Sequence, residues 1–163
     1  MNRGFIAAVI TVAAAAGVLL LLGRIKEQFD SEADLDMATG TITPQIIALA
    51  KAIATAEGFG LPGAIPTLAH NPGDLVIPGW TGAKLGTERI SVFSNDAEGW
   101  DRLYKQLLLI VSNKSHIYSL SDTLASMAAK WTNTAPSAWA MNVASSLGVT
   151  ADTTLRDLIG VNT

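Results

Sequence analysis

The amino-acid sequence predicts a mainly α-helical (α+β) protein with a small β element, preceded by one transmembrane helix. An uncharged apolar run covers residues 5–22, later segments carry apolar residues at helical spacing, and a glycine-rich stretch covers residues 58–89. The predicted organisation is a membrane anchor over residues 1–25, a linker over residues 26–41 and one domain over residues 42–163. The linker is expected because acidic and small residues dominate that segment.

The N-terminal apolar run is the feature that indicates a membrane. No charge interrupts Phe5 to Leu22, and Gly4 and Gly23 extend the run toward the roughly 20 residues that span a bilayer. A cleaved signal peptide is the alternative, but small residues should then end the apolar segment, and here the most apolar part follows them. We therefore expect a retained single-pass anchor. Both flanks carry basic residues, so the positive-inside rule hardly distinguishes its two orientations.

Composition excludes several classes of function. The chain has no cysteine and two histidines, so a Cys-based metal site is impossible and a typical zinc site lacks ligands. We expect no metal and no cofactor. From residue 42 onward, 8 Lys and Arg stand against 9 Asp and Glu, a net charge of −1, which gives no basic surface for nucleic acid.

The first helix of the domain has clear sequence signals at both ends. Thr43 can cap its start, Pro44 suits its first turn, and Gly58 can end it. Glu57 is then its last residue. It lies four positions after Ile53 and continues the apolar stripe that should face the core.

The glycine-rich stretch that follows is too long for an ordinary connection, and it holds seven glycines and four prolines. Residues 75–77 and 90–93 are predicted to form short strands, which could pair with each other. The rest should be ordered loop, and such loops often carry function.

Asn95 followed by Glu98 is a capping box for the next helix. Further helical segments are predicted over residues 122–131, 137–147 and 153–159.

An acidic residue that ends a core-facing stripe is unusual. Burial raises the pKa of a carboxyl group, and the negative end of the helix dipole also disfavours its charged form. A carboxyl group that stays protonated near neutral pH is what a general acid needs to protonate a glycosidic oxygen. Glu57 is therefore the candidate catalytic residue. The alternative is a side chain that points into solvent from a frayed helix end.

Short motifs in a fixed order give a resemblance to a known family. They are Ala56-Glu57-Gly58, His70-Asn71-Pro72-Gly73-Asp74-Leu75, Glu98-Gly99-Trp100, Thr123-Leu124, Ala128-Ala129-Lys130-Trp131 and Leu147-Gly148-Val149 with Asp152-Thr153. This set resembles phage and prophage virion-associated peptidoglycan-degrading proteins with a lysozyme-like fold, over about residues 46–155. The resemblance implies that Glu57 is the acid of a lytic transglycosylase or muramidase.

The type of reaction depends on a second carboxyl group, for which Asp74 and Glu88 are candidates. An inverting hydrolase places its base roughly 6.5–9.5 Å from the acid, and a retaining one its nucleophile at about 5–5.5 Å. A transglycosylase of the kind implied by the resemblance works with one Glu, and the single strong candidate favours it. The family loop usually ends in Asn-Leu, where this chain has Asp74-Leu75, and a Tyr is common at the position of Trp139.

Four residues are predicted to bind substrate: His70, Asn71, Asp74 and Trp80. Asn71 also belongs to a natural tight turn, and His70 could be structural or lie at the rim. Trp80, in the loop, is the predicted sugar platform, whereas Trp131 is expected in the core.

Two classes of function are compatible with the sequence. One is an enzyme that cuts peptidoglycan glycan strands, and the other is a non-catalytic virion or membrane structural protein that keeps the fold and binds glycan. The expected partners are glycan strands, a lipid membrane and other virion proteins, but no nucleic acid. The domain is expected to face the periplasm and cell wall, with a virion membrane as the alternative location.

Overall fold

The computed structural model describes residues 30–36, 38 and 40–160. The predicted membrane anchor over residues 1–25 lies outside this part of the chain. Among the residues described, no helix combines the length and the apolar character needed to cross a membrane.

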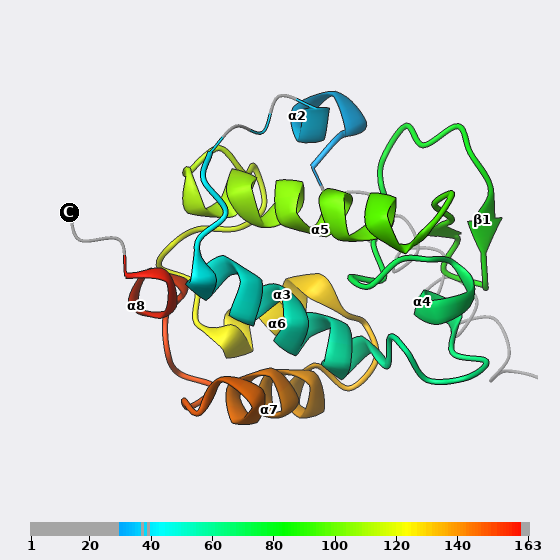
Figure 1. Cartoon of the computed structure of the whole chain (residues 1–163). Helices are drawn as coiled ribbons and strands as arrows, with labels where there is room; N and C mark the ends of the chain where they lie inside the picture. The colour runs from blue at the N-terminus through cyan, green and yellow to red at the C-terminus, as the bar shows by residue number, and fades with distance from the viewer. Residues whose placement is uncertain (1–29, 37, 39, 161–163) are drawn as a thin grey trace, which may run out of the picture.

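The described residues form a mainly helical domain with one small sheet, as the sequence predicts (Figure 1). The helices are α2 (Glu32–Asp36), α3 (Pro44–Glu57), α4 (Ile65–Leu68), α5 (Asp96–Val111), α6 (Leu124–Trp131), α7 (Pro136–Leu147) and α8 (Leu155–Ile159). The strands β1 (Lys84–Leu85) and β2 (Ile90–Ser91) pair antiparallel.

Helix α3 lies at the centre, between α5 on one side and α7 on the other (Figure 1). Apolar residues repeat along this helix at helical spacing and so form one stripe that faces the core. The buried members of the helix are Ile46, Leu49, Ala50, Ala52, Ile53 and Ala54. Helix α6 packs on α7 and completes the core. This arrangement gives the C-terminal end of α3 a fixed position in the domain.

Both ends of α3 follow the prediction. The Thr43 hydroxyl accepts a hydrogen bond from the Ile46 amide at 3.3 Å. At the other end Gly58 adopts a left-handed conformation with φ +80°, which glycine reaches without strain. The helix therefore stops at Glu57. The predicted capping box of α5 also forms in part, since the Asn95 side chain accepts from the Glu98 amide at 3.0 Å.

The prediction of a linker is wrong for the described part of residues 26–41. Helix α2 packs on α5, and Leu35 is fully buried in the core. Asp30 is also buried, and its carboxylate accepts hydrogen bonds from Gln106 Nε2 at 2.9 Å and the His116 amide at 3.0 Å. Composition could not reveal this because the two partners lie 76 and 86 residues away in the sequence.

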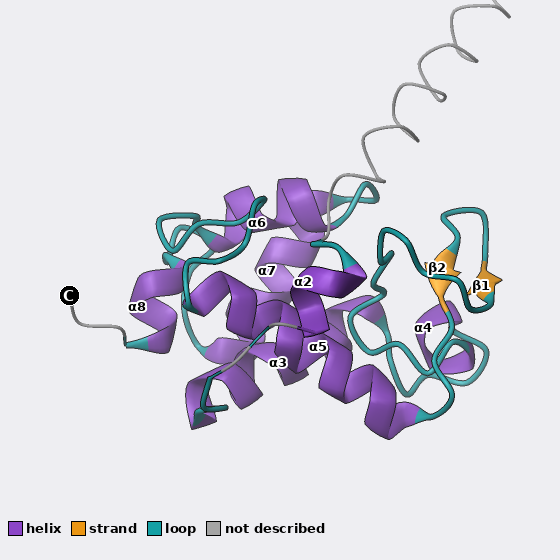
Figure 2. Cartoon of the chain, turned by 90° about the horizontal axis from the view of Figure 1, so that it is seen from above, coloured by secondary structure: helices purple, strands orange, loops and turns teal. Residues whose placement is uncertain are grey.

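The predicted strand pairing is also corrected. Leu85, not residues 75–77, pairs with Ile90. Residues 75–77 nevertheless run beside β2, because the Ser91 amide donates to the Leu75 carbonyl at 3.0 Å and the Ser91 hydroxyl accepts from the Ile77 amide at 3.1 Å. Figure 2 shows the two strands and α4, a helix that the sequence did not predict, at one end of the domain.

Candidate functional site

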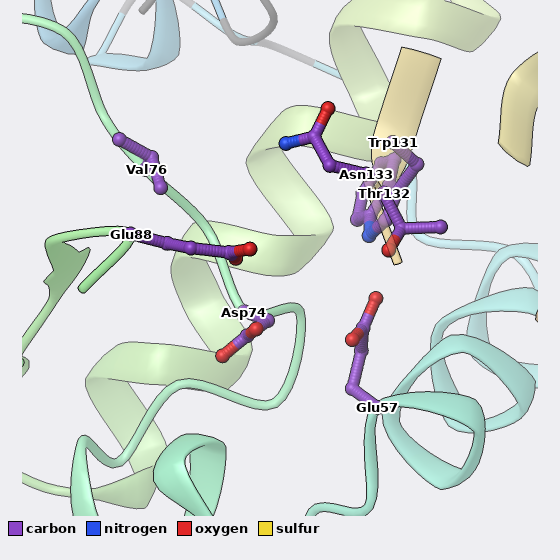
Figure 3. Close-up of a pocket in the computed structure, with 7 residues that line it drawn as sticks. All are labelled: Glu57, Asp74, Val76, Glu88, Trp131, Thr132 and Asn133. Carbon is purple, nitrogen blue, oxygen red and sulfur yellow. The ribbon is translucent and has the colours of Figure 1, made fainter. Parts of the chain in front are cut away.

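A pocket opens where the end of α3 meets the glycine-rich loop and the end of α6 (Figure 3). Its lining residues are Glu57, Asp74, Val76, Glu88, Trp131, Thr132 and Asn133. The loop over residues 58–89 supplies one wall, with Asp74 and Glu88, and Glu57 lies on the opposite wall. Glu57 therefore faces a pocket rather than open solvent, which is the geometry that a catalytic role requires.

The carboxyl group of Glu57 is mostly buried and is held in one orientation. Trp139 Nε1 donates a hydrogen bond to Glu57 Oε1 at 2.7 Å. Burial raises the pKa of Glu57 to about 7, the hydrogen bond from Trp139 opposes the rise, and the charge of Glu88 adds to it. The group can therefore exist in either protonation state near neutral pH, as a general acid that later acts as a base must do.

Asp74 is the second perturbed carboxyl group of the pocket. Burial raises its pKa to about 8, and the nearby charges of Glu57 and Glu88 contribute to the rise. Its backbone is left-handed, with φ +52°, a conformation that Asp tolerates better than most residues. The turn before it imposes this conformation and so fixes where the carboxyl group lies.

Asn71 builds that turn from a fully buried position. Its Nδ2 donates to the carbonyl oxygens of Leu75 and Ser91, both at 2.9 Å, and its Oδ1 accepts from the Leu75 amide at 2.9 Å. The side chain thus ties the turn to β2. Asn71 does not line the pocket, so its place is that of a positioning residue for Asp74 and not of a sugar contact.

Gly99 lets helix α5 approach this turn closely. A Cβ atom at this position would lie 1.8 Å from the His70 carbonyl oxygen and 2.8 Å from Pro72 Cδ. We expect Gly99→Ala to lower the free energy of unfolding by about 1–3 kcal/mol or more, because a backbone atom must move. In an unconstrained helix the same change stabilises by about 1 kcal/mol.

Urea unfolding measures this effect. Ala97→Gly is the matched control, since Ala97 is exposed in the same turn of α5 and reports the intrinsic difference between the two residues. A Gly99→Ala variant as stable as the wild type would contradict the close approach.

Two of the predicted substrate contacts lie away from the pocket. His70 Nδ1 and Asp96 Oδ1 form an exposed pair at 2.6 Å. Trp80 packs edge-on against Phe93, with a centroid separation of 5.3 Å, and the Arg102 guanidinium lies over its ring at 5.5 Å. Neither His70 nor Trp80 lines the pocket.

What sequence reasoning missed is the direct contact between Trp139 and Glu57. Trp131 is buried, as expected, and its ring also lines the pocket, together with Thr132 and Asn133. Trp139, in the first turns of α7, stacks on Trp131 with centroids 6.0 Å apart and reaches Glu57. Its separation of 82 residues from Glu57 left no local signal for this contact.

Trp139→Phe should raise the pKa of Glu57. Phenylalanine keeps an aromatic ring but lacks the N–H donor that favours the carboxylate. A hydrogen bond to a charged group contributes about 1.5–3 kcal/mol, which corresponds to a pKa higher by about 1 to 2. Carbon-13 NMR of labelled glutamate carboxyl groups measures this change in the pKa of Glu57.

Trp100→Phe is the control, because Trp100 contacts Phe59 and Tyr104 outside the pocket. An unchanged Glu57 titration in Trp139→Phe would refute the contact.

The chemistry of the site is that of carboxyl groups. Within the described ranges, no cluster of three or more His, Cys, Asp or Glu residues is arranged to hold a metal ion. The pocket combines a proton donor near neutral pH, a second neutral carboxyl group and a buried indole donor. This set suits acid–base cleavage of a bond to oxygen. Comparisons with family models, curated proteins and solved structures find no match to this chain.

Proposed function

We propose that the protein cleaves the glycan strands of peptidoglycan, as a lytic transglycosylase or a muramidase, with Glu57 as general acid and base. The observation that carries this proposal is the carboxyl group of Glu57, which is mostly buried in a pocket, oriented by Trp139, and has its pKa raised to about 7. Such a group is protonated in neutral or slightly acidic solution, as cleavage of a glycosidic bond requires.

The reaction begins when Glu57 gives its proton to the glycosidic oxygen between N-acetylmuramic acid and N-acetylglucosamine. The bond from the anomeric carbon to that oxygen breaks, and positive charge develops on the sugar ring. Glu57, now a carboxylate, accepts a proton from the incoming hydroxyl group. If that hydroxyl belongs to the same sugar, a 1,6-anhydro ring forms; if it belongs to water, the product has a reducing end.

A lysozyme-like fold is part of the proposal. Its support is a helical domain in which the acid ends a central helix and faces a glycine-rich loop, together with the ordered motifs that resemble phage peptidoglycan-degrading proteins. We also propose that residues 1–25 anchor the domain in a membrane, where it faces the periplasm and cell wall, or in a virion membrane beside other virion proteins.

Product analysis tests the proposal. The full-length protein in detergent is incubated with purified peptidoglycan from several wall types, and the soluble muropeptides are analysed by mass spectrometry. Muropeptides with 1,6-anhydro ends identify a transglycosylase, and those with reducing ends a hydrolase. Absence of both products from every wall type would favour the alternative, a non-catalytic structural protein that binds glycan.

A further inference from the structure

The two buried carboxyl groups of the pocket differ in the hydrogen bonds that their side-chain oxygens receive. Glu57 Oε1 accepts the indole N–H of Trp139 at 2.7 Å, a bond that stabilises a carboxylate. Asp74 Oδ1 is fully buried and, among the described residues, has no hydrogen-bond partner. A carboxylate without a donor on a buried oxygen is costly, whereas a neutral carboxyl group is tolerated.

The charges around Asp74 act in the same direction. The other charged residues that line the pocket are Glu57, from α3, and Glu88, from the loop before β2, and both are acidic (Figure 3). When Glu57 has given up its proton, its negative charge lies across the pocket from Asp74 and strengthens the hold of Asp74 on its own proton. The neutral form of Asp74 is therefore favoured most when Glu57 is ionised.

We propose that Asp74 is the neutral hydrogen-bond donor of the site, whose Oδ2–H binds an acceptor oxygen of the sugar and holds it against Glu57. The inference rests on the proposed function and deepens it. Because Oδ1 is buried, Oδ2 is the oxygen through which this half-buried side chain meets the pocket. Asp74 neither gives nor takes a proton in this scheme, so the reaction needs one catalytic carboxyl group, and Asp74 is a substrate-positioning residue.

Two substitutions separate a neutral donor from a catalytic base. Asn keeps a donor at the Oδ2 position and cannot ionise, and Gly removes the side chain; both tolerate the left-handed backbone at φ +52°. We expect Asp74→Asn to retain kcat/KM for peptidoglycan within about twofold and Asp74→Gly to lose about tenfold, the effect of one hydrogen bond. Asp74→Asn should still lose activity at high pH as the wild type does, because Glu57 must be protonated to act as the acid.

Loss of about 10²-fold or more in Asp74→Asn, the effect of removing an acid–base group, would overturn the proposal and make Asp74 a catalytic base. Full activity in Asp74→Gly would overturn it as well. Carbon-13 NMR of the Asp74 carboxyl group in the full-length protein at pH 6.5 gives a readout that needs no turnover. A protonated group supports the proposal and an ionised one overturns it, whereas an inactive wild type counts against the proposed function.

Discussion

Replacing Glu57 with glutamine should lower the turnover of peptidoglycan by about 10²- to 10⁴-fold, the usual contribution of general acid catalysis. Glutamine keeps the size of the side chain and can still accept the Trp139 indole N–H through its carbonyl oxygen. It cannot deliver a proton of suitable acidity to the glycosidic oxygen. Steady-state release of muropeptides from purified peptidoglycan measures the effect, and circular dichroism verifies that the fold is unchanged.

Glu88→Gln is the matched control for this experiment. Glu88 lines the same pocket, and the substitution makes the same chemical change without touching the residue that Trp139 orients. We expect a loss of less than about tenfold there, since only a nearby charge is removed. If Glu57→Gln kept more than a tenth of the wild-type turnover, or if Glu88→Gln lost as much, Glu57 would not be the acid.

The end of α3 could be predicted because its signals are local. Thr43, Pro44 and Gly58 fix the limits of the helix through capping bonds and backbone preferences that neighbouring residues decide. The apolar stripe then fixes which side of the helix is buried, so the partly buried position of Glu57 follows from its place in that stripe. The mainly helical fold class follows from the same kind of evidence, repeated in α5, α6 and α7.

The rest of the pocket depends on contacts between distant residues. Trp139 meets Glu57 only because α7 packs along α3, and helix packing leaves no mark on the sequence near either residue. The burial of Leu35 and Asp30 depends in the same way on α5. Trp80 lies outside the pocket and packs against Phe93 and Arg102, contacts that also depend on residues distant in the sequence, and its sugar contact stays a prediction.

As the pH rises from about 4.5 to 7, the wild-type domain should become less stable than the Glu57→Gln variant. The pKa of Glu57 is raised from 4.5 to about 7 in the folded protein, so in this window the folded state binds a proton that the unfolded state has released. Stability contributed by that proton is present below pH 4.5 and falls as the pH rises through the folded pKa. The upper limit of the effect is about 3 kcal/mol.

Urea unfolding of wild type and Glu57→Gln at pH 4 and pH 8 measures this difference. We expect the two proteins to be similar at pH 4 and Glu57→Gln to be more stable at pH 8. Glu98→Gln should behave in the opposite way, because hydrogen bonds from Ser94 lower the pKa of Glu98. That carboxylate stabilises the fold above its unfolded pKa, so the variant should be less stable than wild type at pH 8 and closer to it as the pH falls.

The turnover and the stability of Glu57→Gln report separately on the function and on the fold. If Glu57→Gln gains stability and loses turnover, the Glu57 carboxyl group lowers the stability of the fold while it serves catalysis. Such a trade-off is common at catalytic sites. A stability difference between wild type and Glu57→Gln that is the same at pH 4 and pH 8 would mean that Glu57 titrates like an exposed residue. The proposed acid would then lack the raised pKa that its role requires, whatever the shape of the pocket around it.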